Sequence, residues 1–169
     1  MRTFLDRIYN AAGILAALFM IGTLAMVLVG VTGRIVGFHV PGTDAYAGYC
    51  MAAAGFLALA HTLKRGAHIR VTLVLEHIGG KPHRLLELWS LAAGTVLAAL
   101  FAYYSVRLAY QSFDFHDIST ASDATPLWIP QLSMAVGTLI LFVALLDELV
   151  LEWRGARLEK APAEALHNE

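Results

Sequence analysis

The sequence predicts an all-α integral membrane protein with four transmembrane helices. Of its 169 residues, 58% are apolar and only 15% are charged, whereas about a quarter of the residues in a soluble domain are charged. The charged residues are clustered and leave four uncharged stretches between them. These stretches are rich in Ala, Leu, Val, Ile and Gly without a two-residue alternation, which favours helices over the strands of a membrane β-barrel.

Each uncharged stretch is close to the length that a membrane-spanning helix needs. The four contain 26, 19, 19 and 23 residues, and a helix rising ~1.5 Å per residue needs about 20 to cross the hydrocarbon. The predicted spans are residues 8–33, 45–63, 88–106 and 124–146. They form a single four-helix membrane domain, residues 1–153, followed by a charged tail, residues 154–169, that we predict to be disordered.

The first span is predicted to be an uncleaved signal anchor. Arg2 and Arg7 precede it, as basic residues precede a secretory signal. The apolar part of such a signal runs for about 7–15 residues before a small-residue cleavage site. Because this stretch continues as far as Val31, we expect the helix to remain in the protein.

The basic residues predict the orientation. Ten of the twelve Lys and Arg residues precede the first span, lie between the second and third, or follow the fourth. Only Arg34 and Arg107 lie in the other two connections. The positive-inside rule therefore predicts that both termini are cytoplasmic and that the connections 34–44 and 107–123 face outward.

A short amphipathic helix is predicted on the cytoplasmic side, between the second and third spans. Its apolar residues fit the i, i+3, i+4, i+7 pattern of one helical face: Val71, Val74, Leu75 and Ile78. We expect it to lie in the membrane interface with Lys64, Arg65 and Arg70 at the lipid headgroups, or to dock another membrane protein. A short strand is the alternative, but it would expose unpaired backbone.

The outward connection before the fourth span carries a predicted helix start. The third helix is expected to run past the membrane to about Phe115. Ser122-Asp123-Ala124-Thr125 offers capping side chains directly before Pro126, so the fourth helix is predicted to begin at that proline. Three tryptophans near span ends are predicted interfacial anchors: Trp89, Trp128 and Trp153.

No residue pattern predicts catalysis, a metal or a cofactor. No Asp, Glu, Lys or Arg lies within a predicted span, which argues against an autonomous proton-coupled exporter. His61 is the only histidine in a span and has no facing histidine to hold a haem. The single Cys50 excludes an intramolecular disulfide and a multi-cysteine zinc site. The net charge of −1 offers no basic excess for nucleic acid.

Two small-residue spacings, Gly33-x-x-x-Gly37 and Gly48-x-x-x-Ala52, match the pattern of closely packed membrane helices. Such matches also arise by chance in a chain this rich in Ala and Gly. On its residues alone, the chain is interpreted as an accessory subunit. A membrane anchor of a redox complex and a small autonomous channel or carrier remain as alternatives.

Four short segments also connect the chain to a known family. They are Gly33-Arg34, Gly55-Phe56-Leu57-Ala58, Lys64-Arg65-Gly66-Ala67-His68-Ile69-Arg70-Val71 and Thr125-Pro126-Leu127-Trp128-Ile129-Pro130. Over roughly residues 5–150, the chain resembles the small four-helix membrane subunit of tripartite ATP-independent periplasmic (TRAP) transporters. It departs from the family at Thr72, where Asp is common, and at residues 42–46, where Trp and Glu are common.

The resemblance implies a non-catalytic scaffold subunit in the bacterial inner membrane. A periplasmic binding protein would deliver an organic acid to a large multi-span subunit, which carries it inward with sodium by an elevator-like movement. Residues implied to face the binding protein are Arg34, Asp44, Asp114 and Asp117. Residues implied to contact the large subunit or phospholipid on the cytoplasmic side are Lys64, Arg65, His68 and Arg70. The transported acid is not predicted, because selectivity is expected to reside in the partners.

Overall fold

The computed structural model describes residues 2–38, 40–64 and 81–154, and most of these residues are helical. The helices are α1 (Arg2–Val36), α2 (Thr43–Lys64), α4 (Lys81–Asp114) and α5 (Trp128–Trp153). All four are long and apolar enough to cross a membrane. Within the described residues, the predicted four-helix membrane fold is therefore confirmed in the number, length and composition of its long helices.

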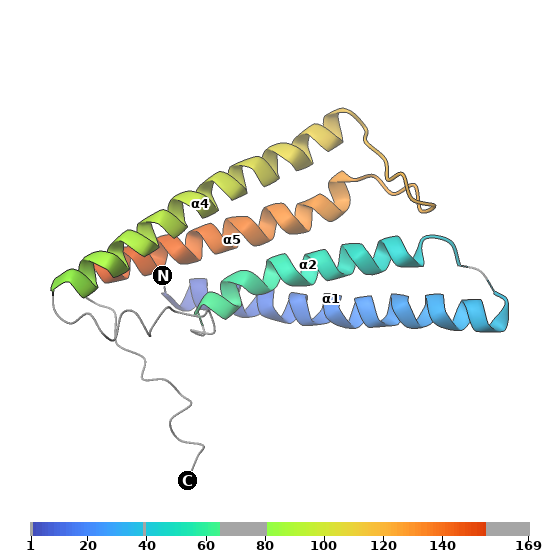
Figure 1. Cartoon of the computed structure of the whole chain (residues 1–169), viewed down its shortest axis with the longest axis horizontal. Coiled ribbons are helices and arrows are strands. Elements are labelled where there is room, and N and C mark those ends of the chain that lie inside the picture. Colours follow the sequence, from blue (N-terminus) through green and yellow to red (C-terminus); the bar gives the residue numbers. More distant parts are fainter. Residues whose placement is uncertain (1, 39, 65–80, 155–169) are drawn as a thin grey trace, which may run out of the picture.

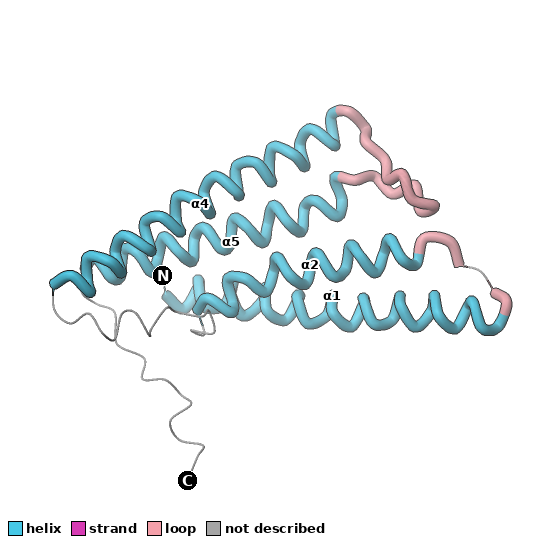
Figure 2. The backbone as a smooth tube through the Cα atoms, in the orientation of Figure 1, coloured by secondary structure: helices cyan, strands magenta, loops and turns pink. Residues whose placement is uncertain are grey.

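The helices lie in a layer in the order α1, α2, α5, α4 (Figure 1). The contact between α2 and α5 joins two hairpins, α1–α2 and α4–α5, so that α1 and α4 form the edges. The α4–α5 connection, residues 115–127, lies at the same end as the α1–α2 connection (Figure 2). We call this the loop end, and we call the opposite end, where α2 and α5 finish, the Lys64 end.

Small residues form the seams between the helices. In α4, six buried residues recur at alternating steps of three and four, which is the spacing of a left-handed coiled coil: Thr95, Ala98, Ala102, Ser105, Ala109 and Ser112. Between α2 and α5 the backbones themselves meet, because a Cβ built on Gly137 would lie 2.6 Å from the carbonyl carbon and oxygen of Phe56. Small side chains thus permit the close approach that helix packing in a membrane requires.

The two small-residue spacings found in the sequence do not pack together any of the helices that the structure describes. Gly37 adopts a left-handed conformation with φ of 78°, and the Phe38 N–H donates to the Gly33 carbonyl over 2.9 Å. This is the hydrogen bond of a Schellman helix ending, so the first spacing terminates α1. A Cβ on Gly48 would meet no described atom within 4 Å, and Ala52 is exposed. Within the described residues, neither spacing packs two helices together, in keeping with matches that arise by chance.

The predicted helix boundaries hold better at the end of α4 than at the start of α5. Helix α4 ends at Asp114, one residue short of the expected position. Helix α5 begins at Trp128 instead of Pro126, and its N-cap residue Leu127 receives no side-chain cap. The reason is that residues 125–127 still pair with residues 117–119, through Ser119 N–H to the Thr125 carbonyl and Leu127 N–H to the Asp117 carbonyl.

Helices α2 and α5 also continue beyond the predicted spans, to Lys64 and Trp153. Charged residues at the Lys64 end are consequently part of the helices. The predicted amphipathic helix, the residues Arg65, His68 and Arg70, and the tail from residue 155 lie outside the described residues.

Candidate functional site

An ion pair closes the α1–α2 hairpin at the loop end. Arg34 Nη2 lies 3.0 Å from Oδ2 and 3.3 Å from Oδ1 of Asp44. Arg34 is in the last turn of α1 and Asp44 in the first turn of α2, so each charge also complements its helix dipole. The two side chains are 68% and 84% exposed, which limits the contribution of the pair to stability to about 0–1 kcal/mol.

The pair forms part of the wall of a pocket of about 260 Å³. The pocket lies between the end of α1, the start of α2 and residues Ala121 and Ser122 of the α4–α5 connection. The structure thus brings together two residues that the resemblance implied as periplasmic contacts, Arg34 and Asp44. Because both side chains remain largely exposed, they are accessible to a partner.

Two tyrosines of α2 hold the α4–α5 connection against the α1–α2 hairpin. The Tyr49 hydroxyl lies within hydrogen-bonding distance of Ser119 Oγ, at 2.9 Å, and of Asp123 Oδ2, at 3.2 Å. The Thr125 hydroxyl lies within hydrogen-bonding distance of the Tyr46 hydroxyl, at 3.3 Å. The side chains predicted to cap the fourth helix are therefore used to attach this connection to α2.

Hydrogen bonding lowers the pKa of the Asp123 carboxyl below its usual value. The Thr125 hydroxyl contributes most, and Ser119, the Asp123 backbone and Tyr49 add to it, while partial desolvation acts in the opposite direction. The bonds stabilise the carboxylate form over the protonated form. Asp123 is therefore expected to remain ionised in this network at neutral pH.

Asp114 and Asp117 lie on the other side of the loop end. Asp114 is the last residue of α4, and Asp117 follows it in the connection. Both are exposed, and neither lines the pocket beside Arg34. Asp114 and Asp117 thus belong to the same end of the layer as Arg34 and Asp44 but lie outside their pocket.

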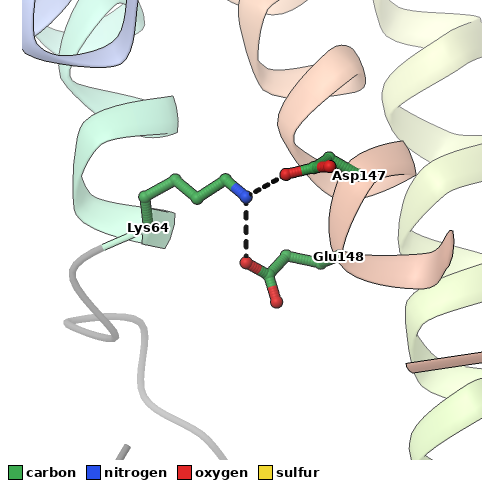
Figure 3. Close-up of polar contacts among 3 residues, drawn as sticks. All are labelled: Lys64, Asp147 and Glu148. Carbon is green, nitrogen blue, oxygen red and sulfur yellow. Dashed lines mark hydrogen bonds and ion pairs between the residues drawn. The ribbon is translucent and has the colours of Figure 1, made fainter. Parts of the chain in front are cut away.

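The Lys64 end contains an ion cluster that the sequence interpretation missed. The Lys64 ammonium donates to carboxylate oxygens of Asp147 and Glu148 in α5, the second over 3.1 Å (Figure 3). Lys64 Nζ also lies 5.3 Å from the centroid of the Tyr9 ring in α1, within the range of a cation–π contact. One lysine therefore links three of the four helices.

This cluster is far less accessible than the Arg34–Asp44 pair. The side chains of Lys64, Asp147 and Glu148 are 18%, 24% and 17% exposed. The ammonium implied to contact lipid or the large subunit is thus engaged within the chain. One signal in the sequence was available: Lys64 and the two acidic residues directly follow the second and fourth uncharged stretches, which were predicted to end on the same side.

His61 packs beside this cluster. Its Nδ1 lies 3.2 Å from the Tyr9 carbonyl oxygen, and a Cβ built on Gly13 would lie 2.7 Å from that nitrogen. The histidine ring thus occupies the space that a glycine leaves on α1. Within the described parts of the chain, no group of three or more His, Cys, Asp or Glu side chains is placed to hold a metal ion.

The three tryptophans lie toward helix ends. Trp153 is the last residue of α5, and Trp89 lies two turns into α4 toward the same end of the layer; both are exposed. Trp128 begins α5 at the loop end, where its ring contacts Phe113 edge-on with centroids 5.7 Å apart. These positions are compatible with anchoring at the two membrane interfaces.

Comparison with known proteins agrees with this architecture. The family model described as "Tripartite ATP-independent periplasmic transporters, DctQ component" matches residues 23–155, a range that contains the ion pair, the α4–α5 connection and the ion cluster. No curated protein matches the chain. The family match covers well over half of the 169 residues. The chain therefore belongs to the DctQ family, the small membrane component of TRAP transporters.

Proposed function

We propose that this chain is the non-catalytic scaffold subunit of a TRAP transporter that imports an organic acid in symport with sodium. Its partners are a large multi-span membrane subunit and a periplasmic binding protein. Membership of the DctQ family supports both partners and favours a transporter component over a redox anchor or an autonomous channel.

The observation that carries the scaffold role is the open arrangement of the helices. Only 11% to 28% of the most apolar 18-residue stretch of each helix is buried within the chain. Large apolar side chains are exposed on all four helices, for example Leu18 of α1, Met51 of α2, Leu97 of α4 and Val136 of α5. Such surfaces require lipid or protein cover, which suits a layer packed beside a larger membrane subunit.

The proposed orientation places the loop end in the periplasm. The distribution of Lys and Arg supports it, since ten of the twelve belong to the opposite side. Arg34 and Asp44, beside their pocket, and Asp114 and Asp117, across the loop end, then face the binding protein. Arg34 has further guanidinium donors beyond the Nη2 group that Asp44 engages, so it is able to bind a partner carboxylate without leaving Asp44.

The proposed cytoplasmic contacts divide into two kinds. Arg65, His68 and Arg70 reach the large subunit or lipid phosphates. Lys64 instead fixes the end of α2, after which that segment begins, to α5 through its bonds to Asp147 and Glu148.

Purification of the tagged chain from its native membrane tests the proposal. We expect a large multi-span protein to co-purify in a fixed ratio, and the binding protein to associate with this complex when its organic acid is present. A monodisperse chain without any large membrane partner would contradict the scaffold role. Ion flux through liposomes that contain the chain alone would instead support an autonomous channel.

A further inference from the structure

Arg107 is a cation on α4, an edge helix of the layer, and pairs with no residue that the structure describes. The two other basic side chains discussed above, Arg34 and Lys64, are both ion-paired. Arg107 is exposed, and it has no hydrogen bond or ion pair to any described residue. A positive charge without a counter-ion on the surface of a membrane helix is stabilised by an anionic partner.

Tyrosines surround Arg107 on the same flank of α4. Tyr103 and Tyr104 precede it by one turn and Tyr110 follows it by one turn, so all three are helical neighbours of the guanidinium. Their rings are exposed, and those of Tyr103 and Tyr104 meet edge-on at 5.3 Å. None of the three hydroxyls bonds to a described residue. The flank faces away from α5, because the buried seam of α4 runs along its other side.

The position of Arg107 along α4 corresponds to the level of lipid phosphates. Trp89 lies 18 residues earlier in the same helix, which corresponds to ~27 Å along the axis, close to the ~30 Å thickness of the hydrocarbon core. With Trp89 in one membrane interface, Arg107 therefore lies in the other. Helix α4 continues to Asp114, so Arg107 is not located where it would neutralise the end of the helix dipole.

We infer that Arg107, Tyr103, Tyr104 and Tyr110 form a binding site for the phosphate of an anionic phospholipid in the leaflet at the loop end. The planar guanidinium is able to bind two phosphate oxygens at once, and the tyrosine hydroxyls supply further donors at the same depth. Because the site carries one uncompensated positive charge, it should prefer phosphatidylglycerol over zwitterionic lipids. The lipid would cover an exposed edge of the layer.

Binding of phosphatidylglycerol to the purified, delipidated full chain tests the inference, for example by native mass spectrometry during a lipid titration. Replacement of Arg107 by Gln should remove one bound lipid or weaken its binding about tenfold, as expected for the loss of one charge-assisted contact. Arg107→Lys should retain part of the binding. Arg34→Gln is the control, because it removes one positive charge on α1, away from this site on α4, and it should leave the lipid bound at Arg107 unchanged.

A second variant separates lipid binding from folding. Tyr103→Phe combined with Tyr110→Phe keeps the rings and removes two hydroxyls, so it should weaken phosphatidylglycerol binding while the helical circular dichroism stays unchanged. Equal phosphatidylglycerol binding by Arg107→Gln and the native chain would overturn the inference. Equal affinity of the native chain for phosphatidylcholine would also overturn it, because the site would then not select an anionic headgroup.

Discussion

The two ends of the layer use ion pairs of the same chemistry in opposite ways. At the loop end, Arg34 and Asp44 form a pair that is open to water and lies beside a pocket. At the Lys64 end, one ammonium and two carboxylates are largely withdrawn from water and link α2 to α5. Both ends carry charged side chains, so charge alone does not separate their roles. The exposure of the side chains does: the exposed pair is available to a partner, whereas the largely buried cluster holds helices together.

The largest expected effect comes from breaking the cluster at the Lys64 end. Lys64→Met removes the ammonium that donates to Asp147 and Glu148 and should destabilise the chain by about 2–3 kcal/mol, somewhat less than for a completely buried pair. Denaturant unfolding in micelles, followed by circular dichroism, measures this. The triple variant with Asp147→Leu and Glu148→Leu should recover most of the loss. Equal loss in the single and triple variants would contradict a role for the charges.

A smaller effect is expected at the seam that connects the two hairpins. Gly137→Val places a side chain against the Phe56 backbone and should cost about 1–3 kcal/mol through overpacking. Gly55→Ala is the matched control in α2, because a Cβ there meets no described atom within 4 Å. The same unfolding assay compares them. A neutral Gly137→Val would show that α2 and α5 do not approach as closely as the structure indicates.

At the loop end, removal of one hydroxyl should act locally. Tyr49→Phe deletes the bonds to Ser119 and Asp123 and should cost about 1 kcal/mol. Hydrogen exchange should accelerate in residues 117–127 and remain unchanged at the Lys64 end. Acceleration spread evenly over both ends would contradict the separation between the two regions.

The ionisation of Asp123 offers a pH test of the same network. Because its pKa is lower in the folded chain than in the unfolded chain, its stabilising contribution is present above the unfolded pKa and is lost as the pH falls through the folded pKa. A carboxyl titration by NMR should give a pKa below the usual Asp value. Thr125→Val and Tyr49→Phe should each raise it toward the usual Asp value, and an unchanged pKa in both variants would contradict the network.

The sequence was sufficient to predict the four helices, because each contains an uncharged stretch of about the length needed to cross a membrane. The sequence was insufficient to predict which helices lie side by side. The small residues that form the helix contacts also occur where no described helix packs, as at Gly48. Because each span was taken as the stretch between two charged residues, Lys64 and Asp147 were placed outside the helices. Their pairing was therefore not predicted. Asp123 and Thr125 were interpreted as caps because their partners, Tyr46 and Tyr49, lie more than 70 residues away.

The smallest effect on stability should accompany a large effect on function. Arg34→Glu removes an exposed ion pair and should change the unfolding free energy by only about 0.5 kcal/mol. If the loop end receives the binding protein, the same change should lower uptake by the assembled complex without preventing its assembly. Arg34→Gln distinguishes loss of the positive charge from its reversal, and its uptake should be intermediate.

Reconstituted transport tests the central claim most directly. Proteoliposomes that contain the large subunit and this chain, supplied with the binding protein, the organic acid and an inward sodium gradient, should accumulate the acid. Omission of the chain should abolish uptake, and Arg34→Glu should reduce it while the complex remains intact. Full uptake by the large subunit and the binding protein without this chain would contradict the proposed role.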